Sequence, residues 1–282
     1  MSLEWLDWSN PVSLWWIFLV SVSTCNIIFW AWSLYYLKRF RSHENNKLIK
    51  ALIWLSAGYV FVCAFRSVLP RADVQRICLF DTWWSSVLVG RTFATIGELC
   101  FIAQWAIVLN QIAKLADSRV TEKLTHFIFP LIVIAEMFSW YAVISTHYLG
   151  NSCEESLWAI TYALILICLV LLFPKFKGAI KYAIALSVFG CVLYIAFMTR
   201  VDVPMYLGRL QADMESGKRL LGLAEGLHDL NTRWVVTHDI EQWKTEIPWM
   251  SLYFSSAVWT SIALCYVPLS NSRIARYLSK HS

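Results

Sequence analysis

Arg91 and Glu98 are charged residues inside a long apolar stretch over residues 82–114, where a buried carboxyl beside a fixed cation could take part in acid/base chemistry. At about 100° per residue, a spacing of seven places both on one face of a helix, about two turns apart. An ionised side chain in the middle of a bilayer costs roughly 3 to more than 10 kcal/mol, so both should face a protein or water-lined interior. The same helix offers further candidate substrate-binding side chains, namely Thr95, Gln104 and Trp105.

A second carboxyl, Glu136, lies near the middle of the next apolar stretch, residues 124–148. Because consecutive membrane spans run in opposite directions, Glu98 and Glu136 are predicted to lie at a similar depth. Two carboxyls at one depth near an arginine can hold different protonation states, which suits a proton donor and acceptor. Trp140 and Tyr141 are candidates for lining an apolar pocket. Arg66, near the end of its own span, either turns inward to the substrate or extends to the interface.

The composition indicates an integral membrane protein. Of 282 residues, 58% are hydrophobic and only 15% are charged, and the mean hydropathy is +0.54, which is too apolar for an ordinary soluble domain. We therefore expect an all-α, polytopic bundle of seven transmembrane helices in one membrane domain, residues 1–282. The predicted spans are residues 11–37, 48–69, 82–114, 124–148, 156–173, 178–199 and 248–267. Asn26, inside the first span, is expected to hydrogen-bond to another helix.

The positions of Lys and Arg predict the orientation. They gather in the C-terminal tail and in the loops after the first, third and fifth spans. By the positive-inside rule, the N-terminus is outside and the C-terminus is cytoplasmic. The long segment 201–247 then lies outside, where apolar residues at near-helical spacing predict a helical loop. This loop either covers the mouth of the bundle as a lid or lies on the bilayer surface.

Metal and cofactor signals are weak. His228, His238 and Asp239 have side chains that suit zinc or iron, but their spacing matches no recognised ligand pattern, so no metal site is predicted. The sequence names no cofactor. Cys78 and Cys153 fall in loops predicted on the same side of the membrane, where they form either a disulfide or two unpaired thiols.

Several function classes lack their motifs. The chain has no GxSxG nucleophile elbow and no glycine-rich phosphate loop. It has no Arg/Lys stripe with interleaved aromatic residues for nucleic acid, so the expected partners are the lipid bilayer and a lipophilic small molecule or an ion. The layout is similar to that of seven-helix receptors and rhodopsins in topology alone. Residues 248–269 contain no lysine to which retinal could attach.

The hypothesis that we favour from the sequence is a membrane-integral enzyme that uses buried carboxylates for acid/base chemistry on a lipophilic substrate. Glu98 and Glu136 would exchange the proton, and Arg91 would set their charge states or hold an anionic group. Three alternatives stay open: a proton- or cation-coupled transporter or ion pathway, a small-ligand seven-helix sensor, and a structural membrane subunit in which Arg91 only locks helices together.

Overall fold

The computed structural model describes residues 7–40 and 47–269, and most of these residues are helical. The elements that form the membrane-length helices and the segments joining them are α1 (Pro11–Phe40), α2 (Lys47–Val68), β1 (Arg71–Ala72), β2 (Ile77–Cys78), η1 (Trp83–Ser85), α3 (Val87–Leu115), α4 (Arg119–Ser145), α5 (Tyr148–Leu172), η2 (Phe173–Lys175), α6 (Ala179–Phe197) and the π-helical η3 (Met198–Asp202). The remaining elements are α7 (Val203–Glu215), α8 (Leu223–Thr232), β3 (Val235–Val236), α9 (Ile240–Trp243), α10 (Glu246–Leu252), the π-helical η4 (Tyr253–Ala257), α11 (Val258–Leu264) and η5 (Val267–Leu269).

Six helices are long and apolar enough to cross a membrane. They are Pro11–Leu37, Lys47–Val68, Val87–Leu115, Arg119–Ser145, Tyr148–Lys175 and Ile180–Glu215. A helix satisfies its backbone hydrogen bonds within the segment, which is why apolar runs of this length cross lipid as helices. The structure therefore supports an integral membrane protein.

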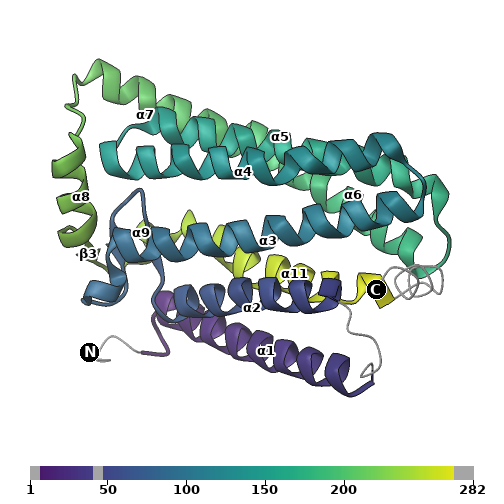
Figure 1. Cartoon of the computed structure of the whole chain (residues 1–282). Helices are drawn as coiled ribbons and strands as arrows, with labels where there is room; N and C mark the ends of the chain where they lie inside the picture. The colour runs from purple at the N-terminus through teal and green to yellow at the C-terminus, as the bar shows by residue number, and fades with distance from the viewer. Residues whose placement is uncertain (1–6, 41–46, 270–282) are drawn as a thin grey trace. The chain divides into compact units, whose positions relative to one another are not determined.

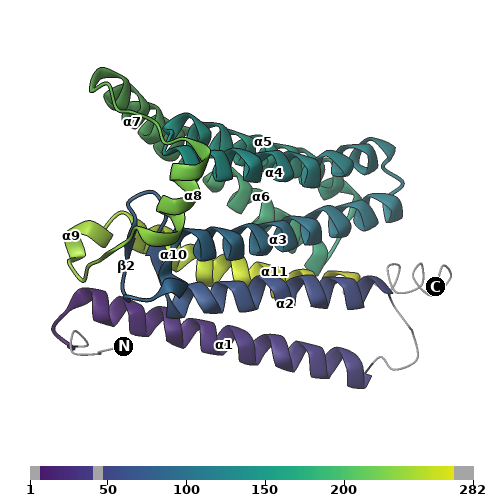
Figure 2. The ribbon, with the colours of Figure 1, turned by 60° about the vertical axis from the view of Figure 1, so that its left-hand side comes forward.

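Two compact units make up the chain: Met1–Phe101 with Leu227–Cys265, and Ile102–Gly226 with Tyr266–Ser282. In the first unit, α1 lies beside α2, and the helical run α10–η4–α11 packs against both (Figure 1). In the second unit, α4 and α5 form an antiparallel hairpin, with α6 and α7 packed on α5 (Figure 2).

Asn26 joins two elements of the first unit, as the sequence predicts. Its Nδ2 donates to the backbone oxygen of Phe254 at 2.8 Å, and its Oδ1 accepts from Trp259 Nε1 at 2.8 Å. A buried amide on α1 thereby holds the run of residues 246–264 against that helix. Ser261 and Ser56, 3.1 Å apart, add a polar contact between α11 and α2.

A small three-stranded sheet in the first unit ties the segment after α8 to the loop after α2. The strand order is β1-β2-β3, with β2 antiparallel to β1 and parallel to β3. Ile77 pairs with Val235 and Cys78 with Val236. Arg76 adds an ion pair of 2.8 Å to Asp229 on α8. Part of the predicted outer loop is thus bound by backbone hydrogen bonds to another loop of the same unit.

The turn between the fourth and fifth helices is earlier than the sequence suggested. The predicted spans, residues 124–148 and 156–173, place the turn at residues 149–155. In the structure α4 ends at Ser145, the following residue Thr146 has a left-handed φ of 59°, and α5 starts at Tyr148. Gly150 lies inside α5, where an added Cβ would come within 2.8 Å of the Phe138 backbone oxygen. The lack of a side chain at Gly150 allows the two helices to approach closely.

Two other predicted boundaries also differ. The sixth helix does not end near residue 199, because η3 carries it without a break into α7, so its membrane-length helix is Ile180–Glu215. The third helix begins at Val87, not at residue 82, because the 3₁₀ turn η1 precedes it. Arg91 consequently lies only about 6 Å along the helix from its first residue.

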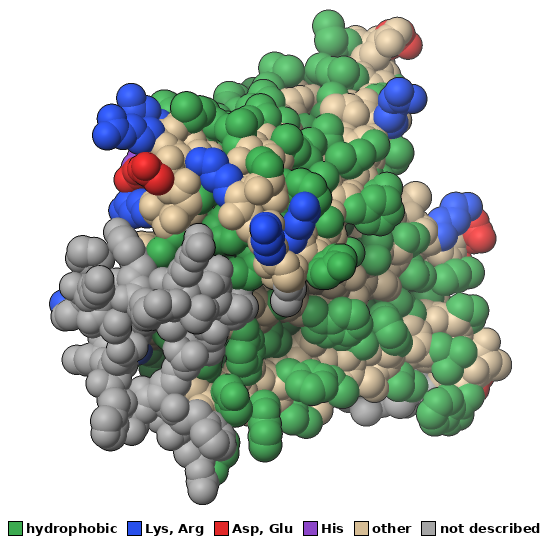
Figure 3. Space-filling view, turned by 90° about the vertical axis from the view of Figure 1, so that its right-hand side faces the viewer, with side chains coloured by type: hydrophobic (Ala, Val, Ile, Leu, Met, Phe, Trp, Pro, Cys, Tyr) green, Lys and Arg blue, Asp and Glu red, His purple; other side chains and the backbone are tan. Residues whose placement is uncertain are grey.

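Large apolar side chains cover much of the surface, as expected for helices in lipid. Figure 3 shows one face on which hydrophobic side chains dominate and charged side chains are few. Leu186 is 72% exposed, Met137 68% and Trp54 65%. Exposed apolar area on this scale exceeds that of an ordinary soluble monomer.

Candidate functional site

Arg91 and Glu98 form a buried ion pair in the first unit. Arg91 Nη2 lies 3.0 Å from Glu98 Oε2, and both residues are less than a tenth exposed. The predicted helical spacing of seven residues brings them together on one face of α3. Tyr253 donates its hydroxyl to Glu98 Oε1 at 3.3 Å. Glu98 is therefore held by a cation and a hydroxyl.

Tyr253, which donates to Glu98, lies in the helix distortion η4. The π-turn begins at Tyr253 itself, and π-turns inside helices are frequent at functional sites. Tyr59 packs edge-on against Tyr253 with ring centroids 5.8 Å apart, and stacks on Phe101 at 4.8 Å. Our sequence reasoning missed Tyr59 and Tyr253, because neither has a charge or motif that distinguishes it from other aromatic residues.

Arg66 and Thr95 also belong to the first unit. Arg66 is only 7% exposed, and its guanidinium lies over the rings of Tyr253 and Phe254, with centroid distances of 5.9 and 5.6 Å. It therefore turns inward, one of the two alternatives that the sequence left open. Thr95 is half-buried on α3.

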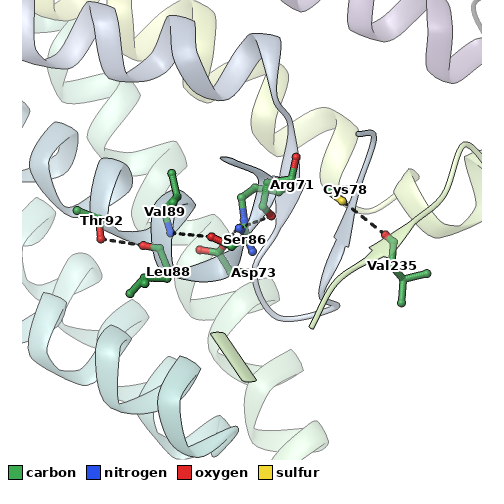
Figure 4. Close-up of polar contacts among 9 residues, drawn as sticks. Arg71, Asp73, Cys78, Ser86, Leu88, Val89, Thr92 and Val235 are labelled. Carbon is green, nitrogen blue, oxygen red and sulfur yellow. Dashed lines mark hydrogen bonds and ion pairs between the residues drawn. The ribbon is translucent and has the colours of Figure 1, made fainter. Parts of the chain in front are cut away.

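Next to this cluster, Arg71 and Asp73 form a second buried ion pair in the loop after α2 (Figure 4). Arg71 Nε lies 2.7 Å from Asp73 Oδ1, and Arg71 Nη1 donates to the Ser85 backbone oxygen at 2.6 Å. Burial alone would raise the pKa of Asp73, but the positive charges of Arg71, Arg66 and Arg91 outweigh it and hold this pKa below its ordinary value of 3.8. The loop aspartate thus faces three arginines.

The second unit contains a pair of buried carboxyls, Glu136 on α4 and Glu154 on α5. Their nearest carboxylate oxygens lie within 4.8 Å, and the two residues are 4% and 6% exposed. Glu154 was missed because we placed a turn over residues 149–155. A signal was present in the sequence, since Asn151, Glu154, Trp158 and Thr161 recur at helical spacing, and all four are buried.

The other predicted substrate-binding residues belong to the second unit. Gln104 and Trp105 are buried on α3, and Trp140 is half-buried on α4. Tyr141 is different: its side chain is 45% exposed, and its hydroxyl lies 2.9 Å from His147 Nδ1. Five residues separate it from Glu136, which places it about 140° away around the helix. Tyr141 therefore does not line the carboxyl pair.

Two of the three weak metal candidates, His238 and Asp239, form hydrogen bonds in the segment that follows α8. His238 Nε2 lies 2.9 Å from the Leu79 backbone oxygen, and Asp239 caps α9 by accepting from Glu241 N at 3.0 Å. His228 is exposed. Within the described part of the chain, no group of potential metal ligands includes any of these three residues.

Cys78 and Cys153 are both free thiols in the structure, which is the second of the two alternatives left by the sequence. Cys78 Sγ donates within the sheet region to the Phe80 backbone oxygen at 3.4 Å and also lies 3.8 Å from the Val235 oxygen (Figure 4). Burial raises the pKa of the Cys78 thiol, although Arg71 acts in the opposite direction. A buried, protonated thiol is a poor nucleophile for disulfide exchange.

Comparison of the chain with models of protein families, with curated protein sequences and with solved structures finds no match. The two buried clusters are therefore interpreted from their own geometry. Glu98 belongs to the first unit and Glu136 to the second, so their action as a donor and acceptor pair stays a prediction.

Proposed function

We propose that this protein is a membrane-integral enzyme that uses buried carboxyl groups for acid/base chemistry on a lipophilic substrate. The observation that carries the proposal is the pairing of Glu136 with Glu154 in the interior of the second unit. Two buried carboxylates at this distance repel each other strongly if both are ionised. The pair therefore holds a proton that it can give up or take back, which is the property of a general acid and base.

Glu98 has a different role in this proposal. Its ion pair with Arg91 and its hydrogen bond from Tyr253 favour the ionised state. A protein that holds one carboxyl ionised and a carboxyl pair partly protonated has groups prepared for opposite proton transfers. Arg91 sets the charge state of Glu98, while Gln104, Trp105 and Trp140 are proposed to contact substrate.

The proposed topology is seven spans with the N-terminus outside. The seventh span is the helical run of α10, η4 and α11, which is apolar and is supported against α1 by Asn26. The segment 201–247 then lies outside. Its pairing with the loop after α2 through β3 supports a lid over one end of the first unit.

The test compares lipids and other lipophilic metabolites from cells that express the wild type, Glu136→Gln or Glu154→Gln, measured by untargeted mass spectrometry. We expect the amount of at least one compound to rise or fall when the wild type is expressed. The size of this change should be at least about tenfold smaller with each variant, since general acid/base groups contribute roughly 10²–10⁴ in rate. Glu122→Gln is the matched control, because Glu122 lies on the same helix but is half-exposed, 3.9 Å from Lys114.

Three results would distinguish catalysis by the carboxyl pair from other functions. A compound that changes equally in all variants would show that the carboxyl pair is not catalytic. A proton flux into liposomes that needs Glu136, without any chemical change, would instead assign a proton pathway. Infrared spectra of the purified protein should show a protonated-carboxyl band that Glu136→Gln removes, and its absence from the wild type would contradict the shared proton.

A further inference from the structure

Arg66 is a buried cation on α2. Within residues 7–40 and 47–269, its guanidinium forms no ion pair and no hydrogen bond, and its Nε is fully buried. A guanidinium has five N–H donors and carries its charge at every physiological pH. Burying such a charge without a partner costs several kcal/mol, so the position of Arg66 needs a compensating group.

The neighbouring acids are already engaged by other arginines. Asp73 interacts electrostatically with Arg66, but its carboxylate lies 2.7 Å from Arg71. Arg71 also donates to the Ser85 carbonyl. Glu98 is 3.0 Å from Arg91. Among the described residues, each of these two arginines has a carboxylate partner, whereas no carboxylate lies within ion-pair distance of Arg66.

The aromatic contacts of Arg66 leave its donors available. The guanidinium carbon lies 5.9 Å from the ring centroid of Tyr253 and 5.6 Å from that of Phe254, within the range of cation–π contacts. These contacts use none of the N–H donors of Arg66, so its planar fork can form two parallel hydrogen bonds to an oxyanion. Tyr253, which is half-buried, offers an apolar surface to whatever is attached to that anion.

The location of Arg66 along its helix suits an amphipathic ligand. It lies two residues before the end of α2, about 3 Å along the axis. In a helix that spans the bilayer, this is the depth at which the hydrocarbon meets the head groups. A ligand bound at this depth can hold its charged group in the head-group layer and its apolar part among the acyl chains.

We propose that Arg66 is the centre of an oxyanion-binding site that takes the phosphate or carboxylate of an amphipathic molecule, whose apolar part lies against Tyr253. The site does not depend on the acid/base chemistry proposed above. An anionic lipid and a small soluble phosphate share the chemistry that it recognises.

The experiment measures binding to the purified full chain in detergent. Native mass spectrometry reports the binding of phosphatidylglycerol against phosphatidylcholine, and calorimetric titration reports that of inorganic phosphate. We expect the wild type to prefer phosphatidylglycerol and Arg66→Gln to lose about tenfold in affinity for it. Arg233→Gln is the control, since Arg233 belongs to the same unit but is 58% exposed and paired with Asp229 at 2.8 Å.

The two probes distinguish a lipid ligand from a soluble oxyanion. Arg66-dependent binding of inorganic phosphate, with no lipid preference, would assign the site to a soluble oxyanion. Unchanged binding of both probes in Arg66→Gln, or no binding by the wild type, would overturn the proposal. If Arg66→Gln fails to fold, Arg66→Lys replaces it, because lysine keeps the charge but lacks the planar fork and should bind more weakly.

Two further measurements separate this site from other roles. A purely structural Arg66 would lower the thermal midpoint when substituted and leave the lipid preference intact. Glu136→Gln should bind phosphatidylglycerol as the wild type does, so failure of the proposed enzyme function and failure of the oxyanion site are distinguishable.

Discussion

At the scale of single residues, Asp73 shows how charge organises the loop after α2. Its carboxylate holds Arg71 in place, and Arg71 in turn binds the Ser85 carbonyl just before α3. Gly90 makes room for this arrangement, since an added Cβ would collide with the Arg71 side chain. One aspartate thereby links the loop, the 3₁₀ turn and the start of a helix.

Replacing Asp73 with Asn should destabilise the protein by about 3 kcal/mol at neutral pH, because Arg71 is left buried without its partner. Since the folded-state pKa of Asp73 is lower than 3.8, its stabilisation is fully present above 3.8 and is lost as the pH falls through the folded value. The thermal midpoints of the wild type and Asp73→Asn, measured in detergent against pH, should differ by a constant amount above about pH 5 and converge below pH 3.8.

The control for this prediction is Asp117→Asn, which changes an exposed aspartate in the turn after α3. Its difference from the wild type should show no such convergence. A gap between the wild type and Asp73→Asn that widens on acidification would contradict the assignment of the buried ion pair.

At the scale of elements, the run α10–η4–α11 depends on its contact with α1. Asn26 accepts from the Trp259 indole and donates to the Phe254 carbonyl, next to the π-turn that presents Tyr253 to Glu98. A π-turn leaves backbone groups with irregular partners, so a side chain that bonds to one of them stabilises the distortion. The position of the Glu98 cluster thus rests on a residue of another helix.

Asn26→Leu should lower stability by about 1 kcal/mol, since hydrogen bonds between membrane helices contribute roughly 0.6 kcal/mol each. It should also weaken the Tyr253–Glu98 contact, which would show as a shift of the Tyr253 band in infrared or ultraviolet Raman spectra. Thr24→Val is the control, because Thr24 bonds only within its own helix, to the Val20 oxygen at 2.8 Å. Equal effects of the two variants would refute the role of Asn26.

At the scale of the whole molecule, the distribution of Lys and Arg predicts the side of the membrane on which each loop lies. With seven spans and an outer N-terminus, Lys218 is outside, while Ser118 and Lys177 are cytoplasmic. With only the six long helices as spans, both ends of the chain would lie on one side.

Single cysteines placed at positions 118, 177 and 218, in a variant lacking the native cysteines, test this prediction in intact cells. A membrane-impermeant maleimide should label only Lys218→Cys, and permeabilised cells should label all three. Labelling of Ser118→Cys from outside would show that the chain has the opposite orientation in the membrane. A tag at each terminus, probed in the same way, should be accessible from outside only at the N-terminus.

The sequence alone was enough to predict the class of the protein and the features that depend on local spacing. The six long helices follow from apolar runs that must satisfy their own backbone in lipid, and the shared face of Arg91 and Glu98 follows from the helical period. Asn26 was also correctly predicted to bond to another helix, because an amide in lipid needs a partner.

Only the tertiary structure decided which distant residues meet. Nothing local in the sequence places Tyr253 at Glu98, because that contact arises from a π-turn and from the packing of a segment far along the chain. Glu154 lies beside Glu136 because the turn between α4 and α5 is at Thr146. With the turn at this position, Glu154 is part of α5 and its carboxyl lies close to that of Glu136. Local periodicity determines the faces of helices, whereas close packing and hydrogen bonds between them determine which faces come together.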